Sequence, residues 1–186
     1  NTREMVHLQS ARSVFKLIEI ARSWNALHGS VYVPVSELTR PNPYLETPMR
    51  DITVNPQLTL TKINPSLMTR ELSELTTNHN GIRFRITSLK LLNPQNHPLD
   101  REKTALKLFD KGRKETWMFV SENNQPIFFY MAPLETDDSC LQCHAGQGYQ
   151  KGDIRGGISI TMPVLAHVPW MGMTLGHVLL LMVGLG

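Results

Sequence analysis

The amino-acid sequence predicts an α+β domain in which a long N-terminal helix and flanking helices cover a small antiparallel sheet, followed by a transmembrane helix. Three observations favour this class: helical spacing of apolar residues at the N-terminus, alternation of apolar and polar residues from position 82 onward, and an apolar C-terminal segment without charge. A chain of 186 residues accommodates one domain with an appendage. We place the domain at 1–163 and the membrane span at 164–186.

Residues 1–29 are predicted to form one long helix. Gly29 is expected to end it, because glycine adopts the left-handed conformation that follows many helices. His28 comes four residues after Trp24, so it is expected on the same face. The apolar residues of that face, which we expect to pack against the domain, are Val14, Leu17, Ile18, Ala21 and Trp24.

Residues 30–63 contain five prolines from Pro34 to Pro56 and little periodicity. We predict a long ordered loop that wraps the domain, a kind of loop that is uncommon without a function. The core of the domain, 64–163, is then expected to open with a helix. Asn64 suits its N-cap, Pro65 its first position and Gly81 its end.

The rest of the domain changes to a period of two. A strand is predicted from Ile82, a short helix over 100–112, and a hairpin with its turn at Glu122–Gln125. A last strand is expected at 153–163. Neighbouring strands of this kind form an antiparallel sheet.

The C-terminal segment carries no Lys, Arg, Asp or Glu after Arg155. From residue 164 it is long enough to cross a bilayer, which takes roughly 20 predominantly apolar residues. The alternative is a buried core helix. The chain begins at Asn1 without an initiator Met or a signal peptide, which we interpret as a trimmed piece of a longer protein.

The charge of the chain argues against a nucleic-acid partner. The net charge is +3, from 19 basic and 16 acidic residues that are spread along the chain without a basic block. No nucleic-acid-binding motif is present.

The only two cysteines, Cys140 and Cys143, stand in a C-x-x-C-H motif with His144. A redox dithiol would be expected near a βαβ pattern, and a structural zinc site would need further ligands, so both are disfavoured. A disulfide between the two cysteines is a further alternative. The motif is the attachment signature of c-type haem, with two thioether bonds and the histidine as proximal ligand. We therefore predict one covalent haem c.

This prediction agrees with the predicted span. In bacteria, covalent haem is attached outside the cytoplasm. We expect a protein of the bacterial inner membrane with the bulk of the chain in the periplasm.

Several separated motifs of the sequence resemble one family: the single-haem c-type sensor domains with a PAS-like fold. The resemblance covers residues 24–163 and includes "WNALHGSVYVP", "NPYLETPMRDI", "INPSLMTRELSEL" and "SCLQCHAGQGYQKGDIRGG". Such domains are periplasmic inputs of bacterial histidine kinases, diguanylate cyclases and chemoreceptor-like proteins. The resemblance implies a PAS-like sheet, a homodimer, and a cytoplasmic output module on the full-length chain.

The sixth iron ligand is less well specified than the proximal His144. Some members of the resembling family use a cysteine there, but both cysteines of this chain are consumed by the haem. The candidates are His28, Met131, Met68 and Met49, or an open site. A buried histidine or methionine with a plain packing role is the alternative for each.

The surroundings of the haem are expected to include Arg155, because a guanidinium suits the carboxylate of a propionate. Lys151 is a similar candidate, and Tyr149 is expected to pack on the haem edge or to close the loop. Further candidates are an aromatic wall and three charged residues with a weaker case: Phe128, Phe129, Tyr130, Arg50, Asp51 and Arg70. Alternate residues of a strand face opposite sides, so at least one of the three aromatic residues must point away from the haem.

The predicted function is sensing: the haem responds to redox state or to a small diatomic gas, and the C-terminal helix carries the change across the membrane. The alternative is a membrane-tethered single-haem electron-transfer cytochrome c. A haem enzyme is disfavoured, because the sequence has no distal His–Arg motif. A haem-free domain that binds a small organic ligand is the interpretation that would remain if the chain held no haem.

Overall fold

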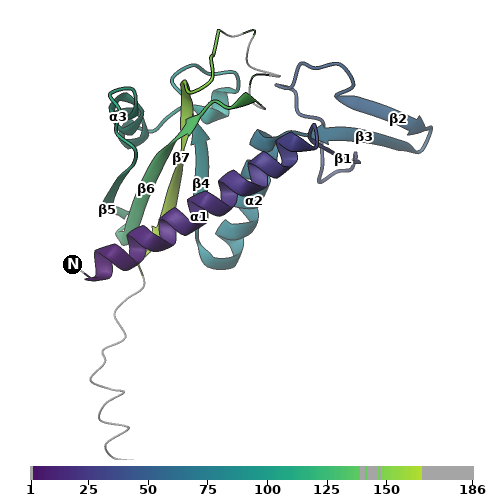
Figure 1. Cartoon of the computed structure of the whole chain (residues 1–186). Coiled ribbons are helices and arrows are strands. Elements are labelled where there is room, and N and C mark those ends of the chain that lie inside the picture. Colours follow the sequence, from purple (N-terminus) through teal and green to yellow (C-terminus); the bar gives the residue numbers. More distant parts are fainter. Residues whose placement is uncertain (1, 139–140, 142–145, 147, 165–186) are drawn as a thin grey trace, which may run out of the picture.

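The computed structural model describes residues 2–138, 141, 146 and 148–164. Its centre is a four-stranded antiparallel sheet in the order β4-β7-β6-β5 (Figure 1). The strands are β4 (Arg83–Thr87), β5 (Thr116–Glu122), β6 (Gln125–Glu135) and β7 (Ile154–Pro163). The predicted α+β class and antiparallel sheet are confirmed.

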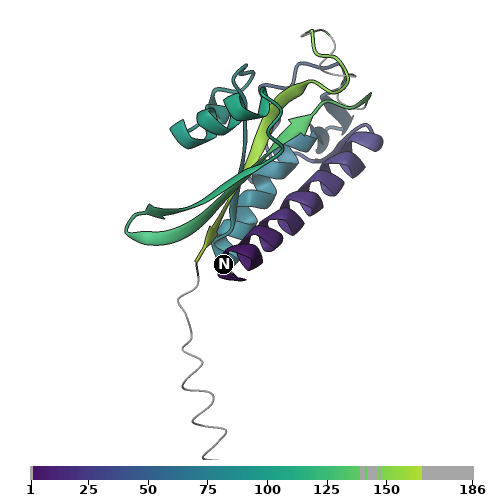
Figure 2. The ribbon, with the colours of Figure 1, turned by 60° about the vertical axis from the view of Figure 1, so that its left-hand side comes forward.

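Helices cover both faces of this sheet (Figure 2). The long helix α1 (Thr2–Leu27) and helix α2 (Pro65–Asn80) lie on one face, and α3 (Asp100–Phe109) lies on the other. A short 3₁₀ helix, η1 (Pro94–Asn96), precedes α3.

Strand β6 supplies the core on both sides of the sheet. Phe128 and Tyr130 pack under α1, and Phe129 and Met131 pack under α3. The expected alternation of the aromatic residues is therefore confirmed.

Local signals place several boundaries where the sequence predicts them. Asn64 caps α2, since its side-chain oxygen accepts from the N–H of Leu67 at 2.9 Å, and Gly81 ends the helix with φ 72. The β5–β6 turn has positive φ at Asn123 and Asn124, which matches the right-handed twist of a two-residue hairpin.

The predicted core stripe of α1 is confirmed at Ile18, which is buried, and at Val14, which packs against the core, but it is wrong at Leu17 and Trp24. Leu17 is 66% exposed and Trp24 is 53% exposed. The buried face consists of Leu8, Ala11, Phe15, Ile18 and Asn25. The helix carries apolar residues on two faces, so periodicity alone does not decide which one meets the sheet.

The predicted wrapping loop at 30–63 contains a second, three-stranded antiparallel sheet, so the loop interpretation is wrong. Its strands are β1 (Val31–Pro34), β2 (Asp51–Asn55) and β3 (Leu58–Ile63), in the order β1-β3-β2. The side chain of Asn55 accepts from the N–H of Gln57 at 2.9 Å and closes the tight β2–β3 connection. This sheet projects from the body of the domain beyond the C-terminal end of α1 (Figure 1).

The predicted membrane span at 164–186 lies outside the described residues, apart from Val164. Within the part of the chain that the structure describes, no helix combines the length and the apolar character that a membrane crossing requires.

A polar cluster fastens α1 to the sheet. Arg12 forms an ion pair with Glu115, and its Nε donates to Glu115 Oε2 at 3.0 Å. The hydroxyl of Tyr130 donates to the same oxygen at 3.0 Å. The hydrogen bond from Arg12 lowers the pKa of Glu115 from its ordinary value, although partial burial acts in the opposite direction.

This cluster predicts a pH-dependent stability. A carboxylate with a lowered folded-state pKa stabilises the fold above its unfolded pKa, and this contribution is lost as the pH falls through the folded value. Glu115→Gln should lower the free energy of unfolding by about 1–2 kcal/mol at pH 7, since Arg12 is partly exposed and screened. The difference from the parent protein should be smaller at pH 3, below the ordinary pKa of a glutamate of about 4.3, than at pH 7. Urea unfolding at both values tests this, and an equal difference at both would contradict it.

Candidate functional site

In the sequence, the C-x-x-C-H motif stands between β6 and β7. The end of β6 and the start of β7 lie at the end of the sheet opposite the N-terminus of α1 (Figures 1 and 2). Cys140, Cys143 and His144 are outside the described residues, so the structure defines this loop by its base. There the N–H of Thr136 donates to the carbonyl of Asp153 at 2.9 Å, and the N–H of Gly152 donates to the carbonyl of Thr136 at 2.8 Å. The described ends of the segment that contains the motif are therefore closed against each other between two central, paired strands.

The base of the loop is fastened further by side chains. Lys151 forms an ion pair with Asp138 at 2.6 Å on the exposed side. The hydroxyl of Thr136 is buried and has no hydrogen-bond partner among the described residues. A donor is thus available where the loop leaves β6.

The end of β4 touches the loop base closely at Gly156. An added Cβ at this position would lie 2.3 Å from the carbonyl oxygen of Thr87, closer than real Cβ contacts allow. The hydroxyl of Ser88 donates to the carbonyl of Arg155 at 2.7 Å. Gly156 therefore lets the segment after β4 approach the motif-bearing loop.

This approach places two cations around Tyr149. Lys90 Nζ and Arg155 Cζ each lie 5.3 Å from the centre of its ring. Two cations around one aromatic ring suit an anionic group such as a carboxylate nearby. Arg155 and Tyr149 are candidates from the sequence. Lys90 was missed, because it reaches the loop only through the folding of β4 against β7.

His28 lies at the end of α1 that is nearest the loop, and it is exposed, contrary to the buried position expected from its neighbours. Its Nδ1 is 2.8 Å from the carbonyl oxygen of Trp24, and the centres of the two rings are 4.6 Å apart with a tilt of 36° between their planes. A carbonyl oxygen only accepts, so Nδ1 carries the proton and Nε2 of the neutral ring keeps its lone pair. This is the arrangement in which metal-bound histidines are typically held.

The methionine candidates lie elsewhere. Met131 is 0% exposed and packs with Leu106, Phe109 and Phe129 under α3. The sulfur of Met68 accepts from Asn25 at 3.8 Å between α1 and α2. Met49 is 68% exposed. Ligation by Met131 would require it to leave the packed core.

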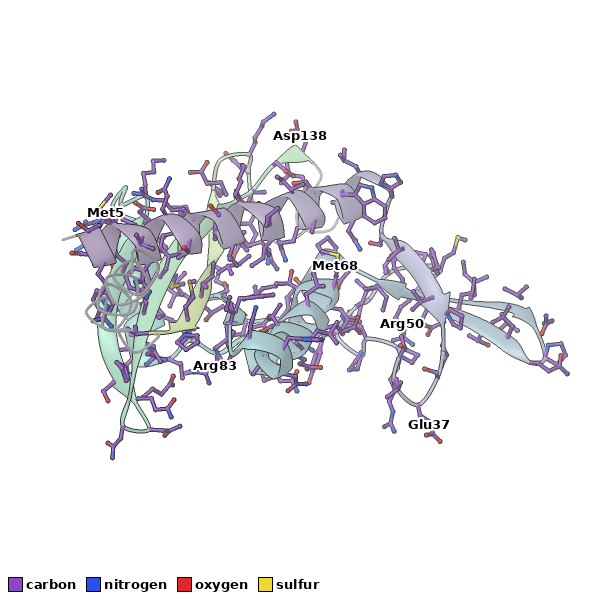
Figure 3. The ribbon with its side chains drawn as sticks, turned by 90° about the horizontal axis from the view of Figure 1, so that it is seen from below. Met5, Glu37, Arg50, Met68, Arg83 and Asp138 are labelled. Carbon is purple, nitrogen blue, oxygen red and sulfur yellow. The ribbon has the colours of Figure 1, made fainter. Side chains whose placement is uncertain are left out.

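The remaining candidates have structural partners away from the loop. Tyr130 is buried under α1 with Glu115, and Arg50 pairs with Asp51 at 2.6 Å on the projecting sheet. Figure 3 shows Arg50 well separated from Asp138 at the loop base. Arg70 lies on α2 and lines a different cavity.

That cavity has a volume of about 660 Å³ and lies along the free edge of β4, next to α2 and the start of α3. Its charged lining consists mainly of ion pairs, such as Arg101 with Glu122 at 3.2 Å and Arg85 with Glu102 at 3.3 Å. None of the described residues of the loop lines it. We therefore take the loop base, and not this cavity, as the candidate site.

Comparisons with known proteins identify the family of this chain. Among the solved structures, the crystal structure of the cyanobacterial heme-protein Tll0287 matches with 21% identity and a TM-score of 0.42, over 53% of this chain and 71% of that chain. No curated protein matches the chain. The family model described as Tll0287-like matches residues 3–163, nearly all of the predicted domain. The narrower resemblance to PAS-like inputs of histidine kinases stays a prediction. By the match of its family model, this chain belongs to the Tll0287-like family.

Proposed function

We propose that this chain is a haem c-binding input domain of a membrane-bound signalling protein, which responds to redox state or to a small diatomic gas. Cys140 and Cys143 would hold the haem covalently, and His144 would be its proximal iron ligand. The proposal includes one haem per chain and no catalytic activity of this domain.

The observation that carries the proposal is the position of the C-x-x-C-H motif on a loop whose two ends are closed against each other by paired strands. A group attached covalently between these ends would be joined to the two central strands of the sheet. The family is described as Tll0287-like, and Tll0287 is a cyanobacterial heme-protein, which supports a haem role for this chain.

The residues around the loop base fit the demands of a haem. Lys90 and Arg155, each 5.3 Å from the centre of the Tyr149 ring, suit the two propionates. We propose His28 as the sixth ligand, since its Nε2 keeps its lone pair and its ring is oriented by the Trp24 carbonyl. The haem would supply an iron centre whose ligation and charge change with the signal.

The positions of the two ends of the domain support attachment to a membrane at the end that lies away from the loop. The N-terminal end of α1 and the C-terminal end of β7 lie side by side, at the end of the domain away from the loop (Figures 1 and 2). A membrane segment at 164–186 would therefore leave the domain beside the start of α1, at the end opposite the described ends of the motif-bearing loop. We propose the periplasmic face of a bacterial inner membrane as the location.

The first test is a pyridine haemochrome spectrum of the full chain made with a cytochrome c maturation system, after acid-acetone extraction. We expect haem absorbance that stays with the protein at the position of two saturated thioether bonds. The variant Cys140→Ala/Cys143→Ala should keep none. Extractable haem, or none at all, in the parent protein would contradict the proposal.

The same haem-loaded protein separates a sensor from an electron carrier. A sensor requires two states that differ in structure. Hydrogen exchange of the amides of α1 should therefore differ between the oxidised and the reduced protein. Identical exchange in both states, and with a bound diatomic gas, would favour the electron-transfer alternative.

A further inference from the structure

The cavity along the free edge of β4 has the properties of a second binding site. Its volume of about 660 Å³ lies in the range of pockets that hold small organic molecules. Strand β4 is the edge strand of the four-stranded sheet, with helix α2 on one side of the cavity and η1 and the start of α3 on the other. The site is separate from the motif-bearing loop, whose described residues do not line it.

The lining of the cavity is almost entirely polar. Among the described residues that line it, only Phe84, Ile86 and Leu99 are apolar. Helix α2 presents a row of polar side chains to the cavity at steps of three or four residues: Ser66, Arg70, Ser73 and Thr77. An apolar ligand would take these groups out of water without giving them partners. The cavity therefore favours a polar ligand.

The walls of the cavity are held in place by hydrogen bonds. The hydroxyl of Ser73 accepts from the N–H of Phe84 at 2.9 Å and joins α2 to β4. The hydroxyl of Thr87 donates to the carbonyl of Asn96 at 2.9 Å and joins η1 to β4. Both walls are thus attached to the same strand. A preformed cavity of this kind reduces the ordering that a ligand has to impose.

Four arginines and three glutamates line the cavity, and their pairing leaves positive charge at one place. Arg85 pairs with the buried carboxylate of Glu102 at 3.3 Å, and this pair is neutral. Glu122 pairs with both Arg83 and Arg101, the latter at 3.2 Å. Two guanidinium groups share one carboxylate there, so a surplus of one positive charge remains beside Glu122.

The guanidinium of Arg101 has hydrogen-bond donors to spare. It carries five N–H groups, of which Nη2 donates to Glu122. Its Nε is buried without a partner, and its Nη1 makes no hydrogen bond within the described part of the chain. The group is oriented by Phe129, since its central carbon lies 5.3 Å from the centre of that ring. The side chain is 26% exposed, so a ligand in the cavity can reach it.

Arg70 is a second cationic position, on α2. Glu74 follows it by one turn and is exposed to solvent. Among the described residues, the Arg70 side chain has no hydrogen bond or ion pair, with Glu74 or with any other group. A guanidinium in this state can hold a carboxylate of a ligand through two parallel N–H groups.

We propose that the cavity binds a small organic acid with two carboxylates, one held by Arg70 and the other by Arg83 and Arg101. Each carboxylate would meet a surplus of one positive charge. The two positions belong to different helices, α2 and α3, which cover opposite faces of the sheet. A compact anion such as acetate or inorganic phosphate would therefore reach only one of them. The proposal does not rest on haem binding.

The test is isothermal titration calorimetry of the full chain in mild detergent, in a buffer without carboxylate or phosphate. The probes are succinate, glutarate and adipate, which differ in the spacing of their carboxylates, with acetate and inorganic phosphate for comparison. The best dicarboxylate should bind to a single site with a Kd of about 100 µM or lower. Acetate and phosphate should bind at least about tenfold more weakly, because each loses one of the two charged contacts.

Arg70→Gln should raise the Kd of the best dicarboxylate about tenfold or more, because a charge-assisted contact is lost. The circular dichroism spectrum should stay unchanged, since this side chain has no hydrogen bond to another described residue. Arg70→Lys keeps the charge but not the planar fork, so its Kd should lie between those of Arg70→Gln and the parent protein. Arg101→Gln should weaken binding in the same direction.

The matched control is Arg113→Gln, which removes the same charge from an exposed arginine outside the cavity and should leave the Kd unchanged. The proposal is overturned if none of the dicarboxylates binds with a Kd below about 1 mM. Equally tight binding of phosphate, an unchanged Kd in Arg70→Gln, or an equal loss of affinity in Arg113→Gln would overturn it too. The haemochrome spectrum is read separately, so either proposal can fail without the other.

Discussion

Gly156→Ala is expected to lower the free energy of unfolding by about 3 kcal/mol and to detach the end of β4 from β7. The added methyl group would lie 2.3 Å from the carbonyl oxygen of Thr87 and 3.3 Å from Cβ of Ser88. The oxygen belongs to the backbone of a strand that is paired with β7, where Thr87 lies opposite Gly157. A strand cannot turn away as a flexible side chain can, so the pairing itself must give way.

The change should also be visible at the loop base, because the hydrogen bond from Ser88 to the carbonyl of Arg155 lies in the same contact. Urea unfolding gives the stability, and amide exchange at 83–88 reports the pairing of β4. Gly146→Ala is the matched control, since an added Cβ there meets nothing within 4 Å among the described residues. Equal stability of the two variants would show that β4 adapts to the methyl group.

His28→Ala is expected to convert the haem-loaded protein from a six-coordinate, low-spin spectrum to a high-spin spectrum in nearly every molecule. Loss of the imidazole removes a strong-field ligand, and no other described histidine shares its position at the end of α1. Added imidazole should restore the low-spin spectrum in the variant, and carbon monoxide should bind the reduced variant more readily than the parent protein.

Two variants keep this prediction specific. His79→Ala removes an exposed histidine at the last turn of α2 and should leave the spectrum unchanged. Met131→Leu conserves the volume of a core side chain and should also leave it unchanged. A spin change with Met131→Leu and none with His28→Ala would make the methionine the ligand and would contradict our choice.

Much of the central domain could be predicted because its signals are local. Asn64, Pro65 and Gly81 mark the two ends of α2 by their own conformational preferences. The turn at Asn123 and Asn124 defines the β5–β6 hairpin in the same way. The motif at Cys140 to His144 is also local, so the candidate chemistry could be proposed before any fold was known.

What could not be predicted depends on contacts between distant parts of the chain. Which apolar face of α1 is buried depends on the sheet that it meets, and Leu17 and Phe15 are equally apolar in the sequence. The strands β1 to β3 are short and are separated by segments that contain prolines, so their alternation is too brief to be recognised. The place of Lys90 beside Tyr149 follows from the close contact at Gly156, which no sequence pattern reports.

The neighbouring ends of the domain have a consequence for its use as a building unit. Near one end of the sheet, Trp117 Nε1 donates to Glu4 at 3.0 Å, and Phe128, which lies opposite Met162 on β7, is 5.5 Å from the ring of His7. The first turns of α1 and the last residues of β7 are thus tied to the same strands. Because the two ends of the domain lie side by side, the domain can be inserted as a unit into a loop of a host protein. The ends of β6 and β7 that border the haem-attachment motif would then lie at the far end of the inserted domain.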